Sequence, residues 1–458
     1  MANNFTVLPA GVLDASHATD SIILCGWVLD KPIDPNRIKK AWATLVSRWP
    51  LLVARLRRDS KSERWEYHIP SVPTLSGSFA FLNISESIRA HYAYAKPSEY
   101  IRCTVKENPH HLFIPYGPKS VDELITGDRP LVHLHVTTFD DGSLVGLSTP
   151  HILCDAHGVA SIIKAVCIIL SGGPPPPPLD LTDPFEPYGH NQGNVPAPPY
   201  WRALNIVQKT VLYARAIWTQ LFDRHVENRD VFFPKSEVQR IKSEAMDDIR
   251  REHGADTDLY ISSSDAILAF CLKCSHPPTW SRAPINIFYT ASLRNMLNLP
   301  QPFLRNAVCM VITPTVPVSA ISSLSLGTLA LHIRKTITAQ TTEEAVETWL
   351  RWRLASAGKL RVFFDPWWGR YDVVTNWREM KLMDVDFDGA LASKDDHVRS
   401  ESERVKCVYM WGNGLQPIAL RNWIGIWADD PSGGIWTSAF MPRRTWNDKR
   451  GYGRYTFE

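Results

Sequence analysis

A histidine and an aspartate four residues apart, His151 and Asp155, are the residues of this chain best suited to chemistry. A neutral imidazole can take a proton from a hydroxyl or an amine near neutral pH and return it later. Asp155 could orient the ring of His151, or it could hold the turn from behind. The alternative is that Asp155 only caps the following helix and that His151 is an ordinary strand-end residue, because short motifs also occur by chance.

The segments on either side predict that this pair lies at a junction between a strand and a helix. A hairpin is expected before it, with strands over 131–139 and 143–149 joined by an Asp-Asp-Gly turn. Apolar residues then recur at helical spacing over 159–170. His151 and Asp155 are therefore expected where one element ends and the next begins.

Further segments with distinctive residues follow one another along the chain. They are Leu13-Asp14, residues 38–56 with Arg48-Trp49-Pro50-Leu51-Leu52, the H-x-x-x-D pair itself, Ser262-Ser263-Ser264-Asp265, Arg294 with Asn306-Ala307-Val308, Thr375-Asn376-Trp377 and Asp386-Phe387-Asp388-Gly389. In this order they make nearly the whole chain resemble the BAHD acyltransferases, and in particular their fungal members. Leu13-Asp14 resembles the opening strand of that family, and 386–389 resembles its DFGWG segment.

The chain departs from the family pattern at several positions. Ala156 follows the aspartate where the family usually has glycine, and Arg305 replaces the glycine before Asn306. Ser292 stands in place of an aspartate, and in the last motif only the first two residues match before Asp388. These departures concern the donor site more than the fold.

The resemblance implies an α/β fold of two similar domains, each like chloramphenicol acetyltransferase and built on a mixed sheet, with an active-site tunnel at their interface. Gly172-Gly173 and five prolines begin a proline-rich stretch, which is stiff and extended and suits a crossover between domains. We therefore expect an N-terminal domain over 1–171 with the H-x-x-x-D motif, a crossover over 172–199, and a C-terminal domain over 200–458. The last would carry the donor-binding side and the segment 386–389.

The reaction implied by the resemblance is acyl transfer from a coenzyme A thioester to an oxygen or nitrogen nucleophile, without a covalent acyl-enzyme. His151 would act as the general base. Thr375 and Trp377 match positions that line the site where charge develops on the carbonyl oxygen, although core packing would also account for them. Asp155 would be an orienting residue that pairs with Arg294 and ties the two halves of the chain together.

The remaining matched positions are expected to be structural or to lie at the donor site; they are Asn306, Asp386, Gly389, Ser262 and Ser263. The main expectation is O-acylation, with acetyl as the acyl group, of a small-molecule secondary metabolite. Acyl-CoA would be a co-substrate, with no permanently bound cofactor. Three alternatives remain: an N-acyltransferase, a condensation-domain-like enzyme with a carrier-bound donor, and a non-catalytic relative that binds a small molecule.

Composition restricts the partners. A chain of 458 residues with a formal net charge of +3 offers no electrostatic case for nucleic acid, and no block of basic residues interleaved with aromatics occurs. The first thirty residues have no basic region followed by an unbroken apolar run, and no stretch approaches the length of a membrane span. We expect a cytoplasmic monomer.

The cysteines and histidines do not predict a metal site. Cys271 and Cys274 form the only C-x-x-C pair, and its apolar helical setting favours buried thiols over zinc. His133 and His135 share one face of a strand, but no third ligand stands at metal spacing. His157 beside the central pair also lacks the spacing of a binuclear site.

Apolar periodicity predicts the rest of the chain. Residues 22–29 should form a buried strand, and Asp34-Pro35 should start a helix that ends before Pro50. An amphipathic helix is expected over 200–222, with a basic face that suits either solvent or a membrane surface. Other expected elements are helices near 262–274, 326–337 and 346–354, and strands over 285–290, 407–411, 420–428 and 434–441. A further strand is expected over 308–318, broken by prolines.

Overall fold

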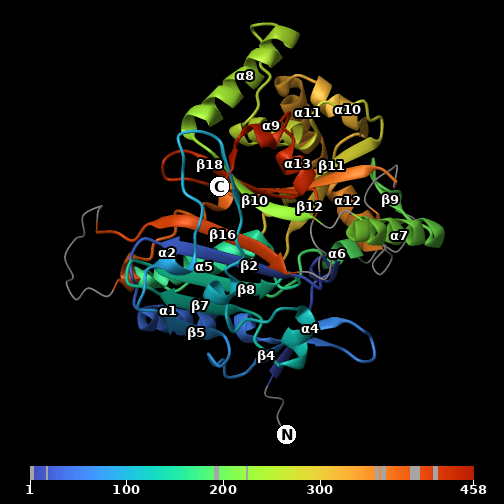
Figure 1. Cartoon of the computed structure of the whole chain (residues 1–458). Coiled ribbons are helices and arrows are strands. Elements are labelled where there is room, and N and C mark those ends of the chain that lie inside the picture. Colours follow the sequence, from blue (N-terminus) through green and yellow to red (C-terminus); the bar gives the residue numbers. More distant parts are fainter. Residues whose placement is uncertain are drawn as a thin grey trace.

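Two large sheets, one above the other, form the centre of the molecule (Figure 1). The computed structural model describes residues 5–16, 19–189, 195–222, 225–355, 361–362, 368–391, 403–415 and 421–457. Both sheets combine parallel and antiparallel strand pairs. The predicted α/β fold with mixed sheets is confirmed.

The first large sheet positions the H-x-x-x-D segment. Its order is β16 (Cys407–Leu415), β2 (Ile22–Leu29), β8 (Ser143–Pro150), β7 (His133–Thr138) and β5 (Phe79–Asn83). The helices α1 (Pro35–Arg48) and α5 (Ala156–Leu170) share one apolar core with it. Every residue of β2 and β8 is buried, which explains why both strands are continuous runs of apolar and small residues.

The second large sheet runs in the order β12, β11, β15, β17, β18, β10, β6, β19, with β13 paired to β11. Its strands are β12 (Val308–Ile312), β11 (Pro284–Ser292), β15 (Arg370–Asn376), β17 (Trp423–Asp429), β18 (Ile435–Pro442), β10 (Val226–Phe233), β6 (Arg102–Val105), β19 (Thr456–Phe457) and β13 (Val316–Pro317). The helices α8 (Lys235–His253), α9 (Ser263–Ser275) and α11 (Leu326–Gln340) contribute to its core.

Each large sheet takes a strand from the far side of the proline-rich crossover. β16 comes from the C-terminal part of the chain and pairs with β2 in the first sheet. β6 comes from the N-terminal part and pairs with β10 in the second sheet. The two layers are therefore joined by exchanged strands as well as by contacts between their faces.

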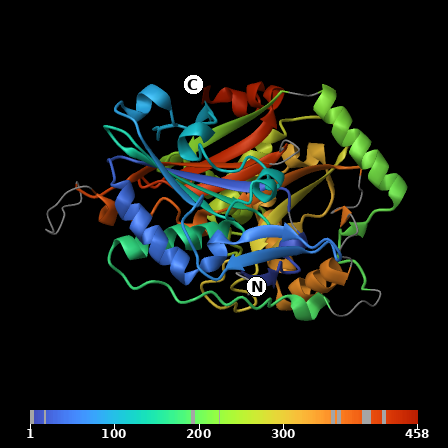
Figure 2. The ribbon, with the colours of Figure 1, turned by 90° about the horizontal axis from the view of Figure 1, so that it is seen from below.

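Smaller elements surround these layers (Figure 2). A three-stranded sheet consists of β1 (Phe5–Pro9), β4 (Trp65–Pro70) and β3 (Arg55–Arg58), and a two-stranded one of β14 (Arg361–Val362) and β9 (Arg202–Ala203). The other helices are α2 (Ile88–His91), α3 (His110–Phe113), α4 (Val121–Thr126), α6 (Glu186–Gly189), α7 (Ile206–Phe222), α10 (Val318–Ser323), α12 (Glu343–Ala355) and α13 (Arg443–Asn447). Short 3-10 helices cover Asp14–Ser16, Pro50–Val53, Arg378–Met380, Asp388–Ala390 and Tyr452–Arg454.

Local sequence signals account for the elements next to the motif. Asp34 caps α1 by accepting a hydrogen bond from the Asn36 N–H, and Pro35 occupies the first turn, where its missing N–H costs nothing. The predicted hairpin is present as β7 and β8. Asp155 caps α5, so the strand, the turn and the helix follow one another as expected.

Two local predictions are corrected by the structure. Asp14 lies in a 3-10 helix and not in a strand, because its buried carboxylate accepts the Gly11 N–H across the turn. The helix expected over 200–222 begins only at Ile206, after the short strand β9. The strand expected over 308–318 is interrupted as predicted, into β12 and β13, with Pro314 between them because proline donates no hydrogen bond to a ladder.

The crossover is tied to the N-terminal core. The indole N–H of Trp49 donates to the Pro177 carbonyl at 2.8 Å, and the Val12 N–H donates to Asp183 at 2.9 Å. Because proline-rich chain cannot join a sheet interior, it crosses the surface and is held by side chains beneath it.

All eight cysteines are buried and unpaired, and burial raises the pKa of the Cys25 thiol to about 12. Among the residues described, no group of three or more His, Cys, Asp or Glu side chains could hold a metal ion. No helix in the described part of the chain is long and apolar enough to span a bilayer.

Candidate active site

His151 is the first residue after β8, and its backbone is fixed on both sides. Its N–H donates to the Ser21 carbonyl at 2.8 Å, and its own carbonyl accepts from the Asn306 amide at 2.9 Å. The side chain lines a cavity of about 270 Å³. Its Nδ1 is buried without a hydrogen-bond partner within the described structure. Such unpaired atoms are rare in native structures and call for an explanation, for example a catalytic role.

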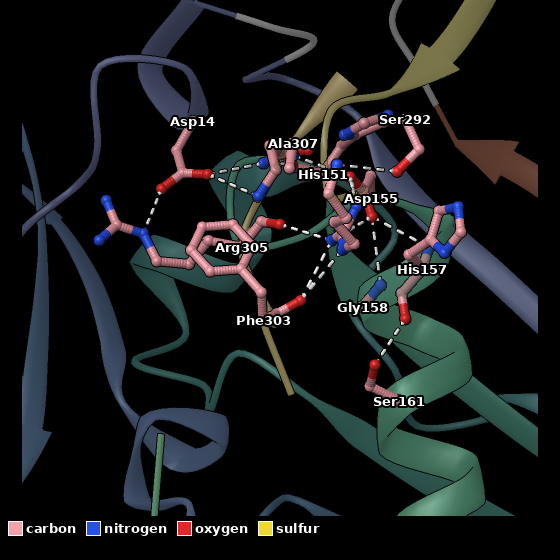
Figure 3. A network of polar contacts seen from close by, with 12 residues as sticks. Asp14, His151, Asp155, His157, Gly158, Ser161, Ser292, Phe303, Arg305 and Ala307 are labelled. Carbon is pink, nitrogen blue, oxygen red and sulfur yellow. Dashed lines mark hydrogen bonds and ion pairs between the residues drawn. The ribbon is translucent and has the colours of Figure 1, made fainter. Parts of the chain in front are cut away.

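Asp155 lies close to His151 and His157 (Figure 3), and its carboxylate is bonded to Arg294. Two parallel hydrogen bonds of 2.8 and 2.9 Å join the guanidinium to the carboxylate, and both residues are only about 5% exposed. The carboxylate also accepts the N–H groups of His157, Gly158 and Ala307. The expected ion pair between the two halves of the chain is present, and Asp155 also caps α5.

The pKa of Asp155 depends on two opposing effects, its burial and its contacts with Arg294 and Ala307. Burial raises the pKa. The charge of Arg294 and the hydrogen bonds from Arg294 and the Ala307 N–H together lower it by more, so that the pKa of Asp155 lies below its ordinary value. Asp155 is therefore a carboxylate at neutral pH. Among the described hydrogen bonds none joins it to the His151 ring, so it supports the loop and does not orient the imidazole directly.

A second buried ion pair lies on the other side of the same loop (Figure 3). The Arg305 guanidinium donates to Asp14 at 2.7 Å and to the Leu181 carbonyl at 3.2 Å. The other oxygen of Asp14 accepts the backbone and side-chain N–H groups of Asn306 at 3.0 and 2.9 Å. Asp14 thus holds the residue whose amide fixes the His151 carbonyl.

The cavity that His151 lines is also lined by a polar cluster of Thr290, Thr375 and Trp377. The Trp377 indole N–H donates to the Thr375 hydroxyl at 2.9 Å, and the Thr290 hydroxyl donates to the same oxygen at 3.0 Å. A hydroxyl oxygen that accepts two hydrogen bonds still has its own proton to donate. Trp377 also packs edge-on against Trp427, with ring centroids 4.6 Å apart. The Thr375 hydroxyl therefore keeps its own proton for a further hydrogen bond, whereas the Trp377 indole N–H is already used by Thr375.

A second cavity, of about 590 Å³, adjoins the first. Both are lined by His157, Thr290, Ala291, Ser292 and Asn376, so that two openings meet near the motif. Burial and the charge of Arg294 lower the pKa of His157, so its imidazole is neutral at neutral pH. The tunnel reachable from both sides remains a prediction, which these adjoining cavities support.

Three other predicted positions, Ser262, Ser263 and Asp386, lie in different surroundings. Ser262 and Asp265 form a reciprocal cap at the start of α9, and Ser262 lines the second cavity. Ser263 is the first residue of α9. Asp386, which accepts the Asp388 N–H, is exposed.

The segment 386–389 was expected on the donor side of the C-terminal domain, but it packs against the far end of α5. Phe387 is fully buried in the N-terminal core, and a Cβ at Gly389 would come within 2.0 Å of the Leu170 carbonyl. The start and the end of α5 are about 20 Å apart, since each residue adds about 1.5 Å. Neither Asp386 nor Gly389 lines the two cavities.

Sequence reasoning missed several contributors to the site. Ser21 and Thr290 act through tertiary contacts and have no local signature, and Asp14 was noted only as part of the segment that resembles the opening strand of the family. Arg305 was noted only as a departure from the family pattern. An arginine replacing a glycine in a buried segment could have prompted a search for a buried carboxylate.

The chain is similar to a known family and to characterised fungal acetyltransferases. A model described as the Transferase family matches residues 110–390. The acetyltransferase adrJ of Penicillium roqueforti is 25% identical over 448 residues, covering 91% of this chain and 89% of that protein. The acetyltransferase MATC1 of Mycosarcoma maydis is 23% identical, covering 99% and 98%.

Among solved structures, TRI101 of F. sporotrichioides complexed with coenzyme A and T-2 has a TM-score of 0.69 at 11% identity and covers 98% of both chains. At that identity the likeness shows the fold alone. The family model covers more than half of the chain, and the predicted family is confirmed. The chain belongs to the Transferase family, the BAHD acyltransferases, and is an acyltransferase.

Proposed function

We propose that this enzyme transfers an acyl group, with acetyl as the expected group, from a coenzyme A thioester to a hydroxyl of a small-molecule secondary metabolite. His151 is the general base, and no covalent acyl-enzyme forms. The observation that best supports this role is the geometry of His151, which lines a cavity while Ser21 and Asn306 fix its backbone on both sides. A rigidly placed base loses little entropy in reaching the reactive geometry.

The reaction follows from the groups that line the first cavity. His151 takes the proton of the acceptor hydroxyl as its oxygen bonds to the thioester carbonyl carbon. Negative charge then develops on the carbonyl oxygen, and the free proton of the Thr375 hydroxyl is the donor for it. The C–S bond breaks, and the departing thiolate takes the proton from the His151 imidazolium.

The second cavity suits the donor. Arg334, Arg378 and Lys381 line it together with three carboxylates, those of Asp265, Glu379 and Asp429. The three cationic side chains are the groups that could contact the phosphates of the donor. Arg334 also pairs with Asp265, and Arg378 with Asp429 and the Ser264 hydroxyl, so two of these side chains are held in place. A structural neighbour that was crystallised with coenzyme A and T-2 supports a donor of this class.

The first cavity suits a largely apolar acceptor. Indole rings of Trp377, Trp423 and Trp427 line it together with Phe440, while polar groups gather near His151 and Thr375. Such a lining binds a hydrophobic skeleton and leaves one hydroxyl to be oriented by the polar groups. The acetyltransferase names of the relatives support acetyl as the acyl group. The proposal includes a cytoplasmic monomer.

The test is release of free thiol from acetyl-CoA in the presence of a panel of alcohols and amines. For the alcohol that the enzyme accepts, His151→Ala should lower kcat by about 100- to 10,000-fold, as expected for the loss of a general base. His157→Ala is the matched control, because His157 lines the same cavity, and it should change kcat by less than about tenfold. Near-normal turnover in His151→Ala would contradict the assignment of the base, and acceptance of amines only would contradict O-acylation.

A further inference from the structure

An exposed apolar face on α7 has no role in the proposed reaction. Figure 1 and Figure 2 both place this helix along the outer edge of the molecule. Ile206 is 74% exposed, Trp218 64% and Phe222 68%. In a helix that packs on a core the apolar side faces inward. In α7 the apolar side faces solvent, which indicates that another surface covers it.

The apolar side chains of α7 form one continuous strip. With 3.6 residues per turn they cover an arc of about 160° around the helix. The members of the strip are Ile206, Val207, Val211, Ile217, Trp218 and Phe222, with Leu221 between them. The partly buried residues of the helix are Gln208, Lys209, Leu212 and Thr219, and Leu212 packs against a core cluster. A strip of this width is broader than the narrow seam of a coiled coil.

The orientation of α7 is fixed by contacts at its start and in its middle. Trp201 and Leu204 are buried just before the helix begins. Asn205 and Gln208 cap each other reciprocally, with hydrogen bonds of 3.1 and 2.9 Å. The Arg215 guanidinium donates to the carbonyls of Trp368 and Gly369. The outward direction of the apolar strip is therefore part of the fold.

The charges of α7 distinguish between two kinds of partner. The helix carries Lys209 and Arg215, which lie on opposite sides of the apolar strip, and it has no acidic side chain. A second copy docked on the same strip would bring two sets of cations together without a carboxylate from either helix. Anionic lipid headgroups supply the complementary charge, and the acyl region beneath them accepts tryptophan, phenylalanine and isoleucine.

We propose that α7 docks this enzyme on the surface of an anionic lipid bilayer. The helix lies flat, with Trp218 and Phe222 inserted at the level of the headgroups. Lys209 and the N–H groups of Arg215 other than those on Nη1, which binds the Trp368 and Gly369 carbonyls, would meet the phosphates. The contact is reversible, because a single amphipathic helix binds far more weakly than a spanning one. It would keep the enzyme near hydrophobic acceptors that dissolve in lipid.

The test is flotation of the full-length protein with phosphatidylcholine vesicles that contain or lack phosphatidylserine. The wild type should float with the anionic vesicles, and high salt should weaken binding several-fold by screening the cations. The double variant Trp218→Ser/Phe222→Ser should lower the partition coefficient by at least about tenfold, because two large apolar side chains leave the contact. Its turnover of an alcohol in detergent-free solution should be unchanged.

The matched control is Val72→Ser/Tyr116→Ser, which removes two apolar side chains that are 77% and 61% exposed elsewhere. It should bind vesicles like the wild type. The proposal is overturned if the wild type does not bind anionic vesicles, or if both double variants bind equally well. It is also overturned if light scattering shows a dimer that only the α7 variant dissociates, because the strip would then be a surface for self-association.

Discussion

Two buried arginines on one loop neutralise aspartates from the N-terminal part of the chain, yet they do so with different geometry. Arg294 grips Asp155 with two parallel hydrogen bonds of 2.8 and 2.9 Å. Arg305 makes one hydrogen bond of 2.7 Å to Asp14 and a longer ion pair of 3.8 Å with Asp183. The first pair forms the wall behind His151, whereas the second gathers three segments that are distant in sequence.

The difference shows that the two ion pairs serve different purposes. The Arg294–Asp155 pair is forked, with two parallel hydrogen bonds, and the Arg305 pair is branched, with contacts to two aspartates. A bidentate pair fixes the plane of a carboxylate, so Asp155 can cap α5 and meet the Ala307 N–H at the same time. Asp14 divides its two oxygens between Arg305 and Asn306, and Arg305 connects this loop to Leu181 and Asp183 of the crossover. The first pair therefore mainly orients a carboxylate, and the second mainly joins segments that are distant in the sequence.

The largest expected effect comes from breaking the forked pair. Asp155→Ala and Arg294→Ala should each lower the free energy of unfolding by about 3–5 kcal/mol, because each leaves a buried charge without its partner. The double variant should lose much less than the sum of the two. Urea denaturation of the four proteins measures this cycle.

A cap-only variant provides the control for that cycle. Ser120 caps α4 by accepting the Glu123 N–H at 3.0 Å, and Ser120→Ala should cost only about 1 kcal/mol. Additive losses in the cycle, or a loss in Arg294→Ala no larger than in Ser120→Ala, would mean that Asp155 is no more than a helix cap.

A smaller effect should distinguish the two arginines by geometry. Lysine keeps the charge but cannot form two parallel hydrogen bonds. Arg294→Lys should therefore lose about 2 kcal/mol or more, whereas Arg305→Lys should lose about 1 kcal/mol, in the range of one net hydrogen bond. Thermal and urea unfolding of both variants tests the contrast, and equal losses would show that the fork has no special value.

The smallest expected effect is a dependence on pH. The pKa of Asp155 is lowered in the folded state, so the stability due to its charge is fully present above the unfolded value of about 3.9. That stability is lost as pH falls through the folded pKa. The stability difference between the wild type and Asp155→Asn should thus be constant above about pH 5 and shrink below about pH 4. A difference that grows on acidification would reverse the sign assigned to this carboxyl.

Local parts of this structure could be predicted from the sequence, and its long-range parts could not. The Asp34 cap, the hairpin before His151 and the helix after it depend on neighbouring residues, whose propensities and periodicity are visible in the chain. The Asp155–Arg294 pair was predicted only through the family resemblance. No local pattern indicates that β6 joins the second sheet or that Arg305 meets Asp14, because both depend on the complete tertiary fold.

The pairing of β16 with β2 has a consequence for how the chain folds during translation. Cys25 lies opposite Gly412 in that pairing, so about 390 residues separate the two partners. At a ribosomal rate of about 5–20 residues per second, about 20 to 80 s pass between the synthesis of β2 and that of β16. During that interval the apolar strand Ile22–Leu29 is a sheet edge, and unpaired apolar edges are templates for aggregation. In a nascent chain this edge of β2 therefore stays uncovered until β16 leaves the ribosome and pairs with it.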